Sequence, residues 1–199
     1  MKLVAGLGNP GEPYRGTRHN AGFDVIDVLA GRHGLSGAFA AMKTDAVAAR
    51  WRRPGEPGMG SQDVWLMKPL TFMNVSGVAV GEMMRYYDIA LADVLIVCDD
   101  VNLPLGRLRA RGSGSEGGHN GLRSVAEHLG TIDYARLRVG VGRGDERRDL
   151  ASHVLARFEP EERPGVEQAI ARAADAVEMW VLDGLARMMN TFNRAEDSA

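Results

Sequence analysis

The chain has 199 residues, of which 45% are hydrophobic and 25% charged, and its formal net charge is −2. These values are typical of a soluble globular protein and are sufficient for one domain with a real core. The single cysteine, Cys98, excludes a disulfide framework and a cysteine-based zinc site. No apolar run approaches the roughly 20 residues of a membrane span. We therefore expect one domain over residues 1–199, with no signal peptide and a cytoplasmic location.

Short β-rich or alternating runs predict six strands, with helical segments between them. The predicted strands are 2–7, 46–51, 63–69, 93–99, 107–111 and 135–140, and the predicted helices are 21–33, 75–87, 120–129 and 160–185. This alternation predicts an α/β fold in which helices surround a mixed, largely parallel, twisted sheet. We expect a hairpin loop over 53–62, and mobile loops near 112–118 and 143–152.

The first predicted strand runs into residues 6–11, whose G-x-G-x-x-G spacing matches a dinucleotide-binding loop. That motif requires a helix to begin within the glycine run. Here two prolines and a further glycine between positions 10 and 16 keep the chain in a loop until about Asn20. The context therefore disfavours a nicotinamide-dependent oxidoreductase. The turn instead presents Asn9, and the loop delivers His19 at the start of the next helix.

Polar side chains suited to catalysis lie where predicted strands and turns end. Three asparagines occupy such junctions, at Asn9, Asn74 and Asn120, and Asp99 ends a very apolar strand. Strand ends of this kind form the ligand crevice of α/β sheets. The helix dipole disfavours a charged imidazole at the position of His19, so this residue is a candidate general base that Asp99 would orient.

No serine or cysteine lies in a nucleophile motif, so we predict that the nucleophile is water. The sequence also contains no metal-binding spacing. Three further histidines are interpreted as ordinary helix residues: His33, His128 and His153.

Positive charge is concentrated in the second half of the chain. Residues 107–148 contain nine arginines and five acidic residues. Alternation places Arg107, Arg109 and Arg111 on one face of their strand, next to a glycine-rich loop at 112–121 that resembles a phosphate cradle before a helix. We interpret this region as a contact with a phosphodiester backbone. An exposed strand face that merely carries charge is the alternative.

Several motifs together resemble the bacterial peptidyl-tRNA hydrolase family. They are residues 6–11, Tyr14 with 17–20, 68–74, Asp99, 117–122, 136–142 and 153–155. The resemblance covers about residues 1–190 in order. It implies a monomeric α/β hydrolase that needs no metal or other cofactor. Such an enzyme cleaves the ester between a peptide and the 3′ ribose of tRNA, and so recycles peptidyl-tRNA released from ribosomes.

By position, the resemblance implies that His19 activates water, that Asp99 stabilises its basic form, and that Asn74 steadies the water or the oxyanion. Asn9 would discriminate N-blocked from free aminoacyl-tRNA. Contacts to the peptide and the tRNA 3′ end are implied for Asn9, Tyr14, Phe72, Met73, Asn74, Gly117 and Asn120.

The family places basic residues for tRNA phosphates at Arg111 and Arg138, and Arg109 joins them from the same strand as Arg111. These arginines would contact the 3′ end and the acceptor stem. A non-catalytic RNA-binding module of the same fold is the alternative, because the basic residues alone would suffice for it.

Overall fold

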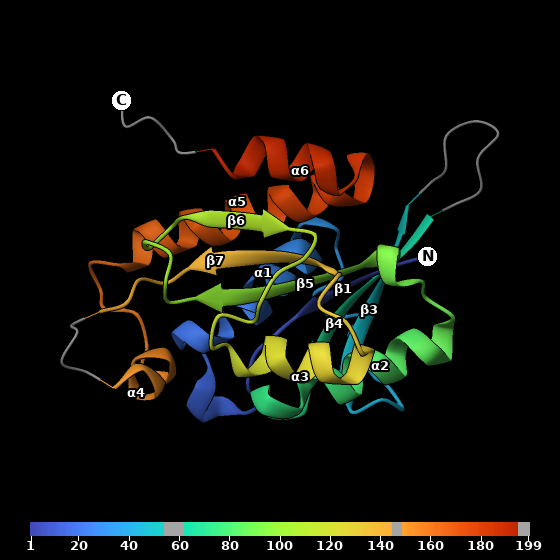
Figure 1. The fold of residues 1–199 in the computed structure, drawn as a ribbon, viewed down its shortest axis with the longest axis horizontal. Coiled ribbons are helices and arrows are strands. Elements are labelled where there is room, and N and C mark those ends of the chain that lie inside the picture. Colours follow the sequence, from blue (N-terminus) through green and yellow to red (C-terminus); the bar gives the residue numbers. More distant parts are fainter. Residues whose placement is uncertain (54–61, 145–148, 195–199) are drawn as a thin grey trace.

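The computed structural model describes residues 1–53, 62–144 and 149–194. In these segments seven strands form one sheet in the order β2-β3-β4-β1-β5-β7-β6 (Figure 1). The strands are β1 Lys2–Gly6, β2 Ala40–Ala41, β3 Ala46–Arg53, β4 Gln62–Pro69, β5 Val94–Asp100, β6 Leu108–Arg111 and β7 Ala135–Gly140. The central strands β4, β1, β5 and β7 are parallel, and β3 and β6 join them by antiparallel pairing. The predicted mixed, largely parallel α/β sheet is confirmed.

The helices pack on both faces of the sheet. They are α1 Ala21–Arg32, α2 Ser76–Tyr87, α3 Asn120–Leu129, α4 Leu150–Leu155, α5 Arg163–Asp183 and α6 Leu185–Phe192. Helices α1, α5 and α6 cover one face, and α2 and α3 cover the other (Figure 1). Neighbouring residues of β1 therefore enter different cores: Val4 packs on the α1 side, and Leu3 and Ala5 pack on the α2 side.

The glycines of the first turn allow helix α1 to pack directly on the sheet. A Cβ atom at Gly6 would lie 2.2 Å from the carbonyl oxygen of Gly22, and one at Gly22 would lie 2.4 Å from the carbonyl oxygen of Val97. Any side chain at either position would push the helix away from β1 and β5. No helix begins in the glycine run, because α1 starts at Ala21 after two short 3₁₀ turns, Glu12–Tyr14 and Arg18–Asn20.

Two helical segments differ from the prediction. The helix expected over 160–185 ends at Asp183, because Gly184 adopts a φ of 83° and the chain restarts as α6. The loop expected over 143–152 contains the start of α4. This helix of six residues was missed because it is too short for a periodic signal; the Asp149 side chain caps it by accepting a hydrogen bond from the Ser152 N–H at 3.1 Å.

Strand β2 was also missed, because it has only two residues. The other six strands lie within two residues of their predicted bounds. Most of the loop expected over 53–62 and part of the 143–152 loop lie outside the described residues. Among the described helices, none has the length and apolarity needed to cross a membrane.

Candidate active site

A cleft of about 540 Å³ is lined by residues of β5, β7 and α4, among others. The arrows of β5 and β7 point toward the end of the sheet where α4 lies (Figure 1). The cleft is built from the loops that follow β1 and β4, the end of β5, the loop before α3, and α4 itself. Nine of the residues predicted for the site line it: Asn9, His19, Phe72, Met73, Asn74, Asp99, Gly117, Asn120 and Arg138. The lining does not include Tyr14, Arg109 or Arg111. Residues as far apart in the chain as Asn9 and Arg138 thus meet at one edge of the sheet, as the strand-end rule predicts.

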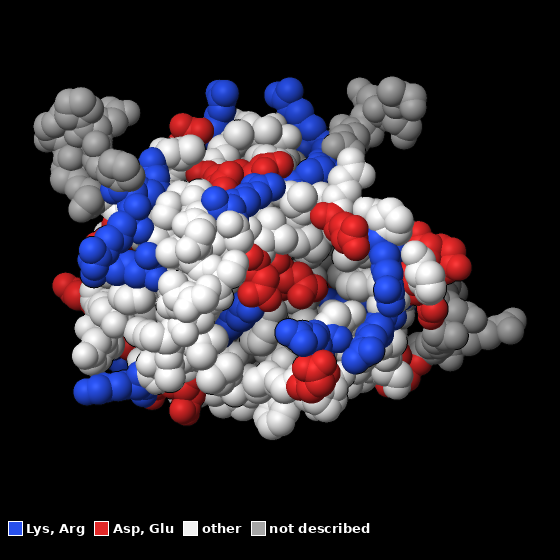
Figure 2. Space-filling view, turned by 180° about the vertical axis from the view of Figure 1, so that it is seen from behind, with Lys and Arg blue, Asp and Glu red and all other residues white. Residues whose placement is uncertain are grey.

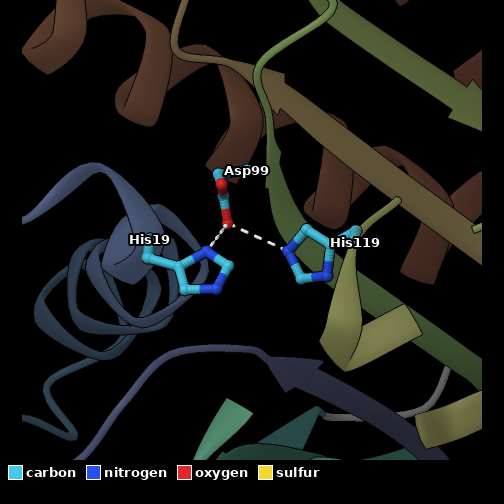
Figure 3. Close-up of side chains that lie close together, drawn as sticks. All are labelled: His19, Asp99 and His119. Carbon is cyan, nitrogen blue, oxygen red and sulfur yellow. Dashed lines mark hydrogen bonds and ion pairs between the residues drawn. The ribbon is translucent and has the colours of Figure 1, made fainter. Parts of the chain in front are cut away.

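The buried pair His19–Asp99 lies at the inner end of this cleft. His19 belongs to the 3₁₀ turn before α1, and Asp99 lies near the end of β5. The imidazole Nδ1 lies 2.8 Å from Asp99 Oδ1 (Figure 3). Because the carboxylate can only accept, Nδ1 carries the proton in the neutral ring, and Nε2 keeps its lone pair. The structure therefore gives His19 the tautomer that a general base requires.

A second histidine contacts the same carboxylate oxygen. His119 Nε2 lies 3.0 Å from Asp99 Oδ1, and the two imidazole rings are 5.1 Å apart between centroids (Figure 3). His119 is also the N-cap of α3, because its Nδ1 accepts hydrogen bonds from the backbone N–H groups of Gly121 and Leu122. These donors fix the proton of the neutral ring on Nε2, where it is donated to Asp99.

His119 is the functional residue that the sequence reasoning did not single out. It lies inside the motif at 117–122, immediately before a predicted helix, which is where an N-cap is expected. Histidine is not among the usual N-cap residues, so its second contact, to Asp99, could not be inferred from local pattern.

The two imidazole donors decide the charge of Asp99. Burial alone would raise the pKa of this carboxyl, but the interactions with His119 and His19 outweigh burial and hold the pKa well below its usual range. Asp99 is therefore a carboxylate throughout the neutral pH range. A fixed negative charge beside His19 stabilises the imidazolium that forms when the ring takes a proton.

The cluster His19, Asp99 and His119 also has the composition of a metal site, with one possible ligand atom from each residue within 4.8 Å of the others. A metal bound at His119 Nε2 would need a lone pair there and a proton on Nδ1. That proton would face the N–H groups of Gly121 and Leu122, which already donate to Nδ1. The hydrogen-bond pattern thus fits a proton-handling cluster better than a metal centre.

Asn9 is held so that only its amide donor is free. Its Oδ1 accepts from the backbone N–H of Met73 at 2.7 Å, and its backbone N–H and C=O bond the side chain of Asn20 at 2.8 and 3.0 Å. Because the Met73 N–H can only donate, Oδ1 must face it and Nδ2 must face away. Nδ2 has no partner among the described residues, so Asn9 offers the cleft a hydrogen-bond donor.

Asn74 and Asn120 present their amides at the cleft wall. Asn74 lies in the 3₁₀ turn Met73–Val75, and Asn120 is the first residue of α3; both are exposed. Neither side chain has a hydrogen-bond partner in the described parts of the chain. Both can therefore donate to, or accept from, a bound ligand without breaking an internal contact.

An aromatic pair stands at the rim of the cleft. Phe72 is 57% exposed, and its ring meets that of Tyr14 edge to face, with centroids 6.2 Å apart. Tyr14 does not line the cleft itself, so it supports Phe72 rather than facing the interior. An exposed ring of this kind offers a stacking surface for a planar group.

The arginines predicted for phosphate contact differ in their surroundings. Arg109 and Arg111 are exposed on β6, with no partner among the described residues, whereas Arg107 donates to the carbonyl of Asn193 at 2.8 Å. Arg138 lies in the cleft, bound to Asp100 at 3.0 Å and to the carbonyl of Ser115 at 2.6 Å. On the face seen from behind, Lys and Arg interleave with Asp and Glu, so that face provides no continuous basic surface (Figure 2).

In the loop at 112–121, which was expected to cradle a phosphate, a side chain occupies two of the backbone donors. The N–H groups of Gly121 and Leu122, the donors that a helix N-terminus would offer, are occupied by His119 Nδ1. The arginines Arg136 and Arg138 instead hold the loop by donating to the carbonyls of Gly114 and Ser115. The loop thus supports His119, and the N–H groups of Gly121 and Leu122 are not free to bind a phosphate.

Residues 3–199 match a family model described as peptidyl-tRNA hydrolase. The chain is 46% identical over 193 residues to the peptidyl-tRNA hydrolase of Geobacillus kaustophilus and 45% identical over 194 residues to that of Desulfitobacterium hafniense. These alignments cover 97% and 98% of this chain and all of each relative. The crystal structure of peptidyl-tRNA hydrolase from Acinetobacter baumannii superposes with a TM-score of 0.83 at 31% identity, covering 100% of this chain and 97% of the other. By sequence, by fold and along its whole described length, the chain belongs to the peptidyl-tRNA hydrolase family.

Proposed function

We propose that this enzyme hydrolyses the ester between an N-blocked aminoacyl or peptidyl group and the 3′ end of tRNA, and so recycles peptidyl-tRNA released from ribosomes. The observation that carries the proposal is the His19–Asp99 pair, 2.8 Å apart, at the inner end of an open cleft. A non-catalytic RNA-binding module would not need a buried carboxylate that fixes a histidine tautomer.

In the proposed reaction, His19 Nε2 takes a proton from a water molecule, and the water oxygen attacks the ester carbonyl carbon. Asp99 stabilises the imidazolium, and the amides of Asn74 and Asn120, which line the cleft, would donate to the developing oxyanion. Collapse of the tetrahedral intermediate releases the tRNA 3′ oxygen, which receives the proton from His19. An aminoacyl ester is an activated substrate, so a positioned base and a few amide donors suffice.

We propose that Asn9 recognises the blocking group through its free Nδ2 donor. An N-acyl group carries a carbonyl oxygen that can accept this hydrogen bond, whereas the ammonium of a free aminoacyl ester has only donors. Arg109 and Arg111 would contact tRNA phosphates, because both are exposed and unpaired in the described structure. Arg138 would have to release Asp100 to do the same.

The test is the release of N-acetylated amino acid from acetylated and from free aminoacyl-tRNA. His19→Ala is expected to lower kcat by at least about 10²-fold, the lower end of general-base effects. His128→Ala is a matched control, because His128 bonds only a carbonyl of its own helix. Near-normal turnover by His19→Ala would refute the assignment.

Asn9→Asp tests the blocking-group contact separately. This variant keeps an oxygen acceptor for Met73 and replaces the Nδ2 donor with a second, negatively charged carboxylate oxygen, which can only accept. We expect the preference for acetylated over free aminoacyl-tRNA to fall, and unchanged selectivity would argue against the role of Asn9.

A further inference from the structure

One wall of the cleft is apolar and consists of α4. Leu150, Ala151, Val154 and Leu155 line the cleft from this helix, and Val101 adjoins them from the loop after β5. The spacing of residues 151, 154 and 155 places them on one helical face. Leu150 and Leu155 are 39% and 43% exposed, although they are large apolar side chains. The polar residues of the catalytic cluster line the same cleft.

The helix is fixed to the fold at its buried face by His153. The imidazole is almost fully buried, and its Nε2–H donates to the carbonyl of Gly142 at 3.0 Å. The ring also lies directly against Gly144, where a Cβ atom would come within 2.6 Å of the ring atom Cε1. His153 thus holds α4 against the segment that follows β7.

A second attachment holds the C-terminal end of α4. Arg18 is 4% exposed, and its Nη1 donates to the carbonyls of Arg157 and Ala156 at 2.6 and 3.4 Å; its backbone N–H also donates to the Ala156 carbonyl, at 3.1 Å. Its other Nη atom pairs with Glu162 at 2.5 Å. Because Arg18 directly precedes His19, the apolar wall and the general base are held by the same turn.

We propose that α4 forms a subsite for an apolar side chain on the amino acid whose carboxyl group is esterified to tRNA, and that His153 and Arg18 are the positioning residues of this subsite. The inference rests on the proposed ester hydrolysis. The first side-chain atom of the esterified residue, Cβ, is two bonds from the reacting carbonyl carbon, so the side chain must reach a wall of the same cleft as His19.

Charge indicates which part of the substrate this wall accepts. Among the described residues, the α4 face carries no cation for a phosphate, and the carboxylates of Asp99 and Asp100 line the same cleft. Arg138, the one arginine among the described residues that line the cleft, is already paired with Asp100. A phosphodiester or an acidic side chain would be repelled here, whereas an apolar side chain would cover Leu150 and Leu155 and remove them from water.

The experiment compares N-acetylglycyl, N-acetylleucyl and N-acetylaspartyl esters on one and the same tRNA, with each enzymatic rate divided by the spontaneous hydrolysis rate of that ester. We expect kcat/KM to be about tenfold higher for the leucyl than for the aspartyl ester, the lower end of what burying a leucine contributes. The glycyl ester should be hydrolysed at an intermediate rate. Equal values for all three esters would overturn the subsite and leave the hydrolase activity intact, whereas no hydrolysis of any ester would refute the proposed function itself.

Variants then locate the preference on α4. Leu150→Ser with Leu155→Ser should abolish the leucyl preference by lowering kcat/KM for the leucyl ester much more than for the glycyl ester, whereas Leu182→Ser, at a 60% exposed leucine of α5, should preserve the preference. A preference that survives the double variant would contradict the proposal.

The attachment is tested at His153. His153→Phe retains the ring but loses the donor to Gly142, and should raise KM for the leucyl ester severalfold more than for the glycyl ester. His153→Gln, which can still donate, should restore part of the difference. An equal rise in KM for the leucyl and glycyl esters would mean that His153 has only a general structural role.

Discussion

The side chains around Asp99 and those along β6 differ in how firmly the fold holds them. Asp99 receives two imidazole donors within 3.0 Å, and His119 is itself fixed by two backbone N–H groups. On β6, Arg109 and Arg111 are exposed and have no partner among the described residues. The first group is ordered when the chain folds, so its geometry contributes to the chemical step. The second would be ordered only on binding, so it should affect affinity and salt dependence.

The largest effect is expected for Asp99→Asn. An amide can donate to His19 Nδ1 and favour the wrong tautomer, and it carries no charge to stabilise the imidazolium. We expect kcat to fall by about 10²- to 10⁴-fold with little change in KM, measured by single-turnover hydrolysis of N-acetyl-aminoacyl-tRNA. Asp93→Asn, at the opposite end of β5, is the control. A kcat within threefold of wild type would show that the fixed pair is not needed.

His119→Asn sharpens the comparison, because it separates the two roles of His119. Asparagine is a good N-cap and should preserve α3, but its shorter side chain cannot reach Asp99. We expect kcat to fall by about tenfold, the value of one hydrogen bond to a charged group, while the melting temperature changes little. His119→Ala should lose both activity and stability. If His119→Asn turned over like wild type, the role of His119 would be limited to capping.

The double variant Arg109→Ser with Arg111→Ser tests the other region. We expect KM at low salt to rise severalfold with kcat unchanged, and the slope of log KM against log salt to decrease by about 1.5, because each phosphate contact contributes about 0.7 to 0.9. Arg52→Ser with Arg85→Ser makes the same change of charge at exposed positions on β3 and α2. If both double variants changed the slope of log KM against log salt equally, β6 would not be part of the tRNA-binding surface.

No effect on activity is expected for Asp24→Asn. This variant tests whether the low pKa of Asp99 depends on its hydrogen bonds, because Asp24 is a partly buried aspartate without them in the described structure. Asp24 of α1 has no hydrogen-bond donor among the described residues. Burial, together with the charge of Asp27, raises its pKa to about 6 against the opposing effect of Lys68. Its contribution to stability is therefore complete below about pH 4, the pKa of an unfolded aspartate, and is lost as the pH rises through 6.

Asp24→Asn should accordingly raise the free energy of unfolding by about 1 to 2 kcal/mol at pH 8, a value reduced for partial exposure to solvent. The gain should vanish near pH 4, while turnover stays at the wild-type value. Denaturant titrations at the two pH values measure it. Equal stabilisation at both pH values would mean that the pKa of the Asp24 carboxyl is not raised in the folded protein.

Much of the fold was predictable, because strands and helices carry local signals. All six predicted strands are present, and β5 has the continuous apolar run of a strand buried on both faces. What was missed is short or depends on contacts: β2 has two residues, α4 has six, and α6 is separated from α5 by the φ of Gly184. None of these produces a periodic pattern long enough to detect.

The site was predictable to the level of residues but not of atoms. His19, Asp99, Asn9, Asn74 and Asn120 could be named because they interrupt apolar segments at strand ends or turns. Which of their side-chain atoms donate, accept or remain free could not be predicted, because this depends on hydrogen-bond partners elsewhere in the chain. For the same reason, local pattern could not show that a histidine occupies two of the backbone donors expected for a phosphate at 112–121.

The sequence by itself determined the order of strands and helices, the edge of the sheet where polar residues meet, and the membership of the family, because these depend on local periodicity and contiguous motifs. Only the tertiary structure decided which proton His119 carries, which atom of Asn9 is free, that Arg138 is already paired, and that α4 provides an apolar wall. The physical reason is distance along the chain. His19 and Asp99 are 80 residues apart, and Asn9 and Met73 are 64 apart, so their hydrogen bonds exist only once the sheet has brought its strand ends together.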